Sequence, residues 1–297
     1  MSERIGYIGL GLMGRPICMN LLKMGYSLNV YARRESAMLP LVDAGAVAFP
    51  SPQALAAECD IIFINVSDSP DVETVVLGEQ GVIHGTRAGC VVVDMSTISP
   101  SVSRSIADKL SSKGIDMLDA PVSGGTVGAK AGSLSIMVGG KAEVFKRLLP
   151  LFEVMGESIT HVGSHGAGQV AKACNQLIVA QMMAAIGEAF VLAEASGVDP
   201  AKVREALMGG FAGSRILEVH GQRMLDSNFE PGFKARLHQK DLRIVCETAA
   251  EMGLSLVGTE MVSEYIDVLV DGGQGELDSA ALVTVLAQRD RITLHKT

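Results

Sequence analysis

The stretch RIGYIGLGLMG, residues 4–14, decides the fold. A short apolar run, Arg4–Gly9, leads into glycines spaced as GxGxxG, and a helix-like segment then continues to Lys23. This order of strand, glycine turn and helix is typical of dinucleotide-binding βαβ units, whereas the glycines alone would indicate only an ordinary turn. The helix N-terminus offers backbone N–H donors and a partial positive charge to a pyrophosphate. We therefore predict that a dinucleotide binds at Gly9, Leu10, Gly11, Leu12, Met13 and Gly14.

The alternation of strand-like and helix-like segments continues to about residue 120. The further apolar runs rich in Ile and Val are Leu28–Tyr31, Ile61–Val66, Val91–Asp94 and Ile115–Asp119. Strands that alternate with helices at this spacing predict a parallel sheet. Three Ser-Pro pairs predict helix starts, because serine caps a helix and proline fits its first turn: Ser51-Pro52, Ser69-Pro70 and Ser99-Pro100.

The pattern changes from Ser133 onward. Leu134–Val138 and Ser158–Val162 resemble two more strands, with a helix over Lys141–Phe152 between them. After the break at 163–166, a long helix is predicted over Ala167–Ala195. The remaining helical segments are Pro200–Met208, Ser214–Leu225, Lys234–Met252, Thr259–Val270 and Ser279–Arg289. We expect a doubly wound Rossmann-type α/β domain in residues 1–164, and a long interdomain helix with an all-helical domain in residues 165–297.

Composition and charge narrow the class of protein. The 297 residues are 48% hydrophobic and 20% charged, which is typical of a globular chain. A net charge of −8 repels phosphate backbones and anionic membranes, so we expect neither nucleic acid nor a membrane as a partner. The most apolar stretch, Leu177–Gly187, is interrupted by Gln181 and is too short to span a bilayer. Five scattered cysteines without a CxxC pair favour reduced thiols in the cytoplasm.

The end of the second predicted strand bears on cofactor choice. A carboxylate usually stands here to bind the ribose hydroxyls of NAD, but this chain has Ala32 followed by Arg33 and Arg34. A guanidinium binds a 2′-phosphate through paired charge-assisted hydrogen bonds. The pattern favours NADP(H), with NAD(H) as the alternative if the two arginines are only solvated surface residues.

A serine and two glycines follow the strand that ends at Asp119. Ser123, Gly124 and Gly125 expose backbone amides at the carboxyl end of a parallel strand, where open α/β sheets bind ligands. These amides are candidates for holding a small carboxylate. The alternative is a flexible loop.

The start of the long helix carries a candidate acid–base group. Lys172, Asn175 and Gln176 are spaced at i, i+3 and i+4, so they share one face of the helix. Apolar neighbours would desolvate the lysine and bring its pKa toward the range in which it exchanges protons. The alternative is a snorkelling lysine beside a packing asparagine. Further on, Lys240 could reach a cofactor from the second domain, unless it belongs to a solvated basic face.

No metal site is expected from the histidines. His161 and His165 are spaced like helical metal ligands, but Gly163 and Ser164 lie between them and a third ligand is not evident.

Five motifs in this order resemble the β-hydroxyacid dehydrogenase family, to which the 3-hydroxyisobutyrate dehydrogenases belong. They are GLGLMG at 9–14, DMSTISP at 94–100, DAPVSGG at 119–125, GQVAKACNQ at 168–176 and KDL at 240–242. The resemblance covers essentially the whole chain. It implies a helical domain that often pairs between subunits, and therefore a homodimer or homotetramer.

The resemblance also implies roles for single residues. The lysine of the family's GxxxKxxxN motif, which is the catalytic acid and base, corresponds to Lys172, and the asparagine that contacts substrate to Asn175. Ser123–Gly125 would hold the substrate carboxylate. Thr97 and Lys240 would approach the cofactor near its nicotinamide end.

The implied reaction is the reduction of a small semialdehyde acid to a hydroxy acid with NAD(P)H. The segments at 207–221 and 233–242 are most similar to family members that reduce tartronate semialdehyde (2-hydroxy-3-oxopropionate) to D-glycerate. The alternatives are 3-hydroxyisobutyrate dehydrogenase and glyoxylate or succinic semialdehyde reductase activity. A catalytically inactive cofactor-binding regulator is a different possibility, which Lys172 and Asn175 disfavour. The chain departs from NAD-using relatives at Ala32, and from many relatives at 65–68, where they carry a proline-containing segment.

Overall fold

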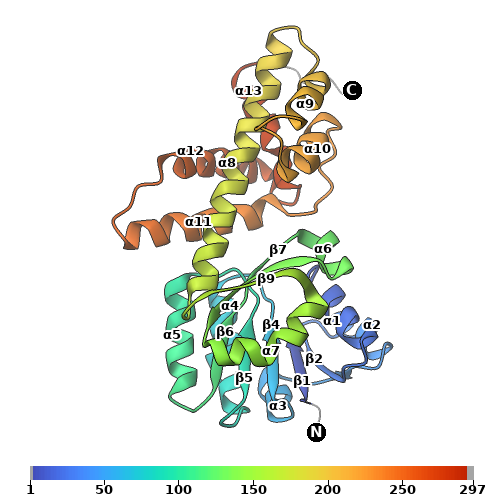
Figure 1. Ribbon diagram of the computed structural model, residues 1–297, viewed down its shortest axis with the longest axis vertical. Coiled ribbons are helices and arrows are strands. Elements are labelled where there is room, and N and C mark those ends of the chain that lie inside the picture. Colours follow the sequence, from blue (N-terminus) through green and yellow to red (C-terminus); the bar gives the residue numbers. More distant parts are fainter. Residues whose placement is uncertain (1–2, 293–297) are drawn as a thin grey trace. The chain divides into compact units, whose positions relative to one another are not determined.

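The computed structural model describes residues 3–292 and forms two compact units, Met1–Lys172 and Ala173–Thr297. Figure 1 shows the helices and strands of both units in the colours of the sequence. The long helix α8 (Ala167–Ala195) begins in the first unit and continues into the second.

The first unit contains one mixed sheet. Its strands are β1 (Ile5–Ile8), β2 (Leu28–Tyr31), β3 (Val47–Ala48), β4 (Ile61–Ile64), β5 (Val91–Asp94), β6 (Asp116–Asp119), β7 (Val122–Ser123), β8 (Leu134–Gly140) and β9 (Gly156–Gly163). Their order is β3-β2-β1-β4-β5-β6-β8-β7, with β9 paired to β8. Neighbours from β3 to β6 run parallel, whereas β8 runs antiparallel to β6 and β7. The predicted Rossmann-type sheet is confirmed, with β3 and β7 as short strands that the sequence pattern did not predict.

The parallel ladders bring the carboxyl ends of four strands to one edge of the sheet. Ile8 pairs with Ile64, Ile64 with Asp94, and Asp94 with Asp119. The chain leaves β1 toward β2 on one side and later reaches β4 on the other. The topological switch point therefore lies beyond the carboxyl ends of β1 and β4, where open α/β sheets bind their ligands.

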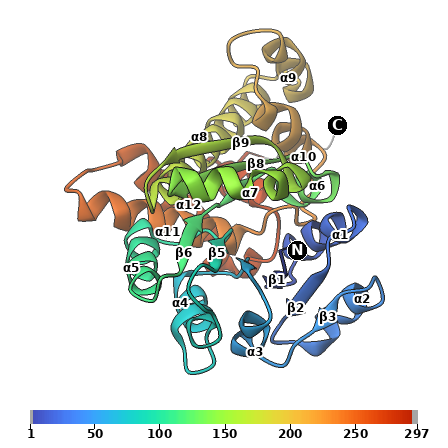
Figure 2. The same ribbon diagram turned by 60° about the horizontal axis from the view of Figure 1, so that its bottom comes forward.

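Helices cover both faces of this sheet (Figure 2), which is why its central strands are buried and mostly apolar. One face packs against α1 (Gly14–Lys23), α2 (Leu39–Val42), α6 (Gly125–Ala131) and α7 (Ala142–Met155). The other packs against α3 (Pro52–Ala57), α4 (Ser69–Leu77) and α5 (Pro100–Ser111). Single turns of 3-10 helix lie at Glu35–Ala37 and Val82–His84.

Two of the three predicted serine caps are confirmed. Ser51 accepts the backbone N–H of Ala54 at 3.1 Å, and Ser99 accepts that of Ser101 at 3.3 Å. The third prediction is wrong, because α4 begins at Ser69 itself and is capped by the Asp68 carboxylate, which accepts the Ser69 N–H at 2.7 Å. A charged acceptor forms the stronger bond to the helix N-terminus.

The second unit is helical within the described residues. After α8 it contains α9 (Pro200–Met208), a π-helical turn (Leu217–Gly221), α10 (Gln222–Leu225), α11 (Ala235–Glu251), α12 (Val257–Leu269), a second π-helical turn (Val270–Gln274), a 3-10 turn (Ser279–Ala281) and α13 (Leu282–Arg289). The helix predicted over Ser214–Leu225 therefore contains a π-helical turn, and the one predicted over Ser279–Arg289 begins with a 3-10 turn.

Helix α8 forms the centre of the second unit's core. Ala180, Met183 and Phe190 are buried among side chains of α11, α12 and α13. By length and apolar composition α8 would be able to cross a membrane, since the helix extends well beyond the apolar stretch at Leu177–Gly187. Core helices of soluble proteins share that property, and 44% of the most apolar stretch of α8 is buried within the structure.

Candidate active site

The turn after β1 has a backbone geometry that explains why glycine stands at positions 9, 11 and 14. Gly9 adopts φ +100°, and a Cβ there would lie 2.1 Å from the Asn65 carbonyl oxygen. A Cβ on Gly14 would lie 2.0 Å from the Gly9 carbonyl oxygen, so no larger residue would allow helix and turn to approach as they do. A Cβ on Gly11, by contrast, would meet no atom within 4 Å. That open side lies at the N-terminus of α1, whose first turn contains no acidic residue.

The neighbouring strand ends are tied to one another by short hydrogen bonds. After β4, the backbone N–H of Val66 donates to Ser96 Oγ at 2.9 Å. After β5, the backbone N–H of Ser96 donates to the buried Asp94 carboxylate at 3.0 Å. Thr97 follows directly and is half-buried. These bonds tie the loop that carries Thr97, the residue predicted near the nicotinamide, to the ends of β4 and β5.

The two arginines after β2 are exposed. The Arg33 side chain is 80% exposed and forms an ion pair of 3.4 Å with Asp71 in the first turn of α4. Ala32 before it is half-buried and carries no charge. The end of β2 therefore presents positive charge where many dinucleotide sites present a carboxylate.

The serine and glycines of the DAPVSGG motif do not form a loop. Ser123 lies in β7, paired with Ser135 of β8, and α6 begins at Gly125. Gly124 between them has φ +127° and Gly125 has φ +60°, conformations that side chains rarely adopt. The candidate amides are thus held in a tight strand-to-helix turn.

Asp119 and Gln169 hold the first turn of α8, and motif reading alone did not single them out. The two Asp119 oxygens accept the backbone N–H of Gly166 at 2.8 Å and of Gln169 at 3.0 Å. Burial raises the pKa of Asp119, and these hydrogen bonds partly oppose that rise. The Gln169 side chain accepts from the N–H of Ile98 at 3.1 Å and donates to the Ser96 carbonyl at 2.8 Å. Two features of the sequence could have pointed to these residues: Asp119 is an acid at the end of a buried strand, and Gln169 is a glutamine in an apolar segment.

Lys172 stands one turn after Gln169 and is only 7% exposed. Because Asp119 and Gln169 fasten this turn to the ends of β5 and β6, Lys172 belongs to the same sheet edge as the glycine turn and Thr97. The turn at 9–14, Thr97, Ser123–Gly125 and Lys172 all belong to the first unit.

Asn175 and Lys240, the other predicted site residues, belong to the second unit. The Lys240 side chain is 13% exposed and pairs with Asp241 at 2.7 Å, so it is not part of a solvated face. Asn175 is half-buried and donates through Nδ2 to Gln176 Oε1 at 2.7 Å. Asn175 follows Lys172 by three residues, whereas a GxxxKxxxN motif places its asparagine four residues on, and Gln176 occupies that position here.

The two histidines bond to backbone. His161 Nε2 lies 2.8 Å from the Gly140 carbonyl oxygen, and His165 Nε2 lies 3.0 Å from that of Met117. Both therefore act as structural contacts between β9, the following turn and the sheet.

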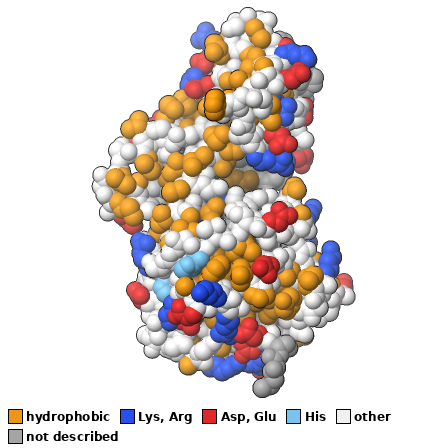
Figure 3. Space-filling view, viewed as in Figure 1, with side chains coloured by type: hydrophobic (Ala, Val, Ile, Leu, Met, Phe, Trp, Pro, Cys, Tyr) orange, Lys and Arg blue, Asp and Glu red, His pale blue; other side chains and the backbone are white. Residues whose placement is uncertain are grey.

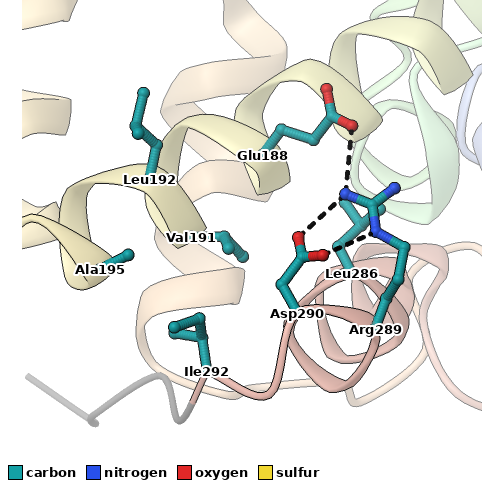
Figure 4. Close-up of a pocket in the computed structure, with 8 residues that line it drawn as sticks. All are labelled: Glu188, Val191, Leu192, Ala195, Leu286, Arg289, Asp290 and Ile292. Carbon is teal, nitrogen blue, oxygen red and sulfur yellow. Dashed lines mark hydrogen bonds and ion pairs between the residues drawn. The ribbon is translucent and has the colours of Figure 1, made fainter.

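A hollow of about 450 Å³ lies in the second unit, between the C-terminal part of α8 and α13 (Figure 4). Five of its lining residues are aliphatic residues of α8 and α13 or of the segment that follows, namely Val191, Leu192, Ala195, Leu286 and Ile292. Arg289 crosses one side and pairs with Glu188 and Asp290. None of the predicted site residues lines this hollow.

Two family models match successive parts of the chain, which together span most of residues 4–286. One, described as the NAD binding domain of 6-phosphogluconate dehydrogenase, matches residues 4–163. The other, described as NAD-binding of NADP-dependent 3-hydroxyisobutyrate dehydrogenase, matches residues 166–286.

Similar proteins and solved structures cover nearly the whole chain. The 2-hydroxy-3-oxopropionate reductase of Escherichia coli (strain K12) is 46% identical over 283 residues, which are 95% of this chain and 97% of the relative. Among solved structures, Mycobacterium tuberculosis 3-hydroxyisobutyrate dehydrogenase with L-serine has a TM-score of 0.88 at 30% identity, covering 96% and 99% of the two chains. Psf3 in complex with NADP+ and 2-OPP has a TM-score of 0.85 at 27% identity, covering 95% and 99%.

These matches agree with the motif order and with the glycine turn at the switch point of the sheet. The chain belongs to the β-hydroxyacid dehydrogenase family, is similar throughout to 3-hydroxyisobutyrate dehydrogenases, and is an NAD(P)-dependent oxidoreductase that acts on a CH–OH group.

Proposed function

We propose that this enzyme reduces tartronate semialdehyde to D-glycerate, with Lys172 as the proton donor. The observation that carries the proposal is the buried Lys172, fastened by Asp119 and Gln169 to the sheet edge that also holds the glycine turn. The substrate is inferred from the similarity to 2-hydroxy-3-oxopropionate reductase.

In the reducing direction, the substrate carboxylate binds the backbone amides at Ser123–Gly125. Asn175 contacts the substrate, and Lys172 as an ammonium donates its proton to the carbonyl oxygen. The developing alkoxide is neutralised as it forms, which is general acid catalysis with electrostatic support. The bound nicotinamide supplies the hydride, and Thr97 and Lys240 would hold its ring end. In the oxidising direction Lys172 acts as the base.

NADP(H) is the proposed cofactor, bound at residues 9–14. The support is the positive charge at Arg33 and Arg34 with no carboxylate at Ala32. A similar solved structure holds NADP+, and the second family model is described as NADP-dependent. NAD(H) is the alternative, because Asp71 already neutralises part of the charge on Arg33.

The second candidate is 3-hydroxyisobutyrate dehydrogenase activity, favoured by the likeness to the Mycobacterium tuberculosis structure. Glyoxylate and succinic semialdehyde remain further substrate alternatives. A catalytically inactive regulator would have no need of a buried lysine held at the cofactor edge.

The test is a turnover assay of the purified protein against four carbonyl acids, each with NADH and NADPH. These are tartronate semialdehyde, methylmalonate semialdehyde, glyoxylate and succinic semialdehyde. We expect the highest kcat/KM with tartronate semialdehyde and NADPH. A higher kcat/KM with another acid would identify that acid as the substrate in place of tartronate semialdehyde. No turnover with any of the four acids would overturn the proposed reaction.

We further propose that residues 1–164 form the dinucleotide-binding domain, that residues 165–297 serve substrate binding and assembly, and that the enzyme is a cytoplasmic homodimer or homotetramer. Exposed apolar side chains support assembly, including Ile178, Leu192, Val257 and Val268 of the second unit. Figure 3 shows hydrophobic side chains spread over one face of that unit. Light scattering of the purified chain should give twice or four times the mass of 31.1 kDa.

A further inference from the structure

Four side chains of the second unit form a continuous chain of polar contacts between α8 and α11. Lys240 Nζ lies 2.7 Å from Asp241 Oδ1. The other carboxylate oxygen, Oδ2, accepts from Gln176 Nε2 at 2.6 Å. Gln176 Oε1 in turn accepts from Asn175 Nδ2 at 2.7 Å. Asp241 and Gln176 are buried, so solvent does not compete for these bonds.

The carboxylate at one end sets the direction of every bond in this chain. An ionised carboxylate can only accept, so Gln176 must turn its NH₂ group toward Asp241. Its oxygen then faces Asn175, and Asn175 must donate to it. The Asn175 oxygen Oδ1 is thereby directed away from Gln176 and is left to accept from another donor. Lys240 supplies the charge that makes a buried carboxylate tolerable at this position.

We propose that Asp241 is a positioning residue that acts through Gln176 to fix Asn175 as a hydrogen-bond acceptor toward a hydroxyl of the substrate. This inference rests on the proposed function, since it takes Asn175 as the substrate-contacting amide. It extends that function by naming the group recognised: a donor on the hydroxy acid, and not a second carboxylate or carbonyl oxygen. An amide free to flip would offer either its oxygen or its NH₂ group and would discriminate less.

The first test compares Asp241→Asn with Asp267→Asn. The control carboxylate also accepts from a glutamine, because Gln239 Nε2 donates to Asp267 Oδ1 at 2.8 Å between α11 and α12. We expect Asp241→Asn to lower kcat/KM for the hydroxy acid by about 10²-fold, the scale of a misplaced contact in the reacting geometry. The control should stay within about twofold, with both unfolding midpoints measured to exclude loss of fold. Asp241→Asn activity equal to the control would overturn the proposal.

The second test uses Gln176→Glu. If Gln176 had only a structural role, the turnover of this variant relative to the unmodified enzyme would not depend on pH. At neutral pH the introduced carboxylate cannot donate to Asp241. Its pKa should be raised by the adjacent Asp241 carboxylate and by burial, whereas Lys240 and, one turn earlier on α8, Lys172 oppose that rise. Once protonated, it donates to Asp241 and again accepts from Asn175.

We therefore expect kcat/KM of Gln176→Glu, relative to the unmodified enzyme at each pH, to recover as the pH falls. Gln176→Leu should show no such recovery, while circular dichroism follows the fold at every pH. A ratio that does not change with pH would contradict the proposal. Loss of turnover in the unmodified protein itself would instead overturn the proposed function, and this inference with it.

Discussion

The backbone N–H of Gln169 donates to the Asp119 carboxylate at 3.0 Å, so the acid that ends β6 caps the first turn of α8. The partner oxygen of Asp119 holds Gly166 in the same way. A Cβ on Gly168 would lie 2.3 Å from the Met137 carbonyl oxygen, which shows how closely this turn packs on the sheet. The helix that carries Lys172 is therefore fixed at its start by a buried charge.

Replacing this cap should destabilise the fold. In Asp119→Asn the new NH₂ group would face one of the two backbone N–H donors, and we expect a loss of about 2 kcal/mol in the free energy of unfolding. The matched control is Asp116→Asn at the other end of β6, where the carboxylate pairs at the surface with Lys141 at 2.6 Å. That change should cost less than about 1 kcal/mol. Urea unfolding of both variants checks the difference, and equal midpoints would refute the role of Asp119.

Lys172→Ala should abolish proton transfer without removing the cofactor site. We expect kcat to fall by about 10²–10⁴-fold, the usual contribution of a general acid. The dissociation constant for NADPH, measured by fluorescence, should change little because residues 9–14 remain intact. Lys202→Ala, which alters an exposed lysine of α9, serves as the control. Near-normal turnover by Lys172→Ala would remove Lys172 from the mechanism.

Cofactor preference is expected to depend on the arginines after β2. The double change Arg33→Ala and Arg34→Ala should raise the Kd for NADPH by at least about tenfold, equivalent to ~1.4 kcal/mol, through loss of charge-assisted bonds to the 2′-phosphate. The Kd for NADH should change far less. Arg215→Ala removes another exposed arginine that pairs with an acid, and neither constant should respond to it. Parallel weakening of both cofactors by the double variant would show that these arginines do not distinguish them.

Substitutions at Gly9 and Gly11 should affect stability and cofactor binding differently. Gly9→Ala combines φ +100° with a Cβ only 2.1 Å from the Asn65 carbonyl oxygen, and we expect it to destabilise the protein by at least about 2 kcal/mol. Gly11→Ala meets no atom within 4 Å, so its unfolding midpoint should stay near that of the parent. Its Kd for NADPH should nevertheless rise by about tenfold or more, ~1.4 kcal/mol, because the methyl group obstructs the pyrophosphate. Normal cofactor binding by Gly11→Ala would argue against the proposed site.

Local sequence patterns were sufficient to predict most strands of the sheet, but not its shortest strands or the helix α6. The four-residue strands β1, β4 and β5 consist mainly of apolar residues on both faces, a signal that needs no tertiary information. The strands β3 and β7 have two residues each, too few for any periodicity. The sequence pattern did not predict the glycine-rich helix α6, in which Gly128 packs so closely on Leu134 that a Cβ there would lie 3.1 Å from its side chain. Tertiary packing overrides helix propensity at this position.

The candidate site likewise contains residues that the sequence could predict and contacts that it could not. Residues within one motif, such as Gly9 to Gly14 or Lys172 to Gln176, could be named because their spacing is local. The bond between Gln176 and Asp241 joins residues 65 positions apart, and nothing in either segment specifies the other. The cap of α4 by Asp68 shows that even a local choice between neighbouring acceptors depends on the final backbone.

Asp278 should make the second unit sensitive to acid. Burial alone would raise the pKa of this carboxyl, but the neighbouring His220, the backbone N–H groups of Phe233 and Ala280, and Arg223 outweigh burial and lower the pKa to about 2. A depressed pKa in the folded state means that the stabilisation is present above the unfolded value of 3.8 and is lost as the pH falls toward 2.

The free energy of unfolding that Asp278 contributes, and that is lost between pH 3.8 and 2, is about 2 kcal/mol for a pKa shift of this size. The measurement is the urea midpoint of the full chain at several pH values between 5 and 2.5. Asp278→Asn should unfold more easily at neutral pH and show a shallower decline than the parent below pH 4, because its side chain no longer binds a proton. Asp226→Asn, which changes an exposed acid that accepts from Gln222 at 2.9 Å, should keep the parent's decline. Superimposable pH profiles for Asp278→Asn and the parent would show that another carboxyl governs acid unfolding.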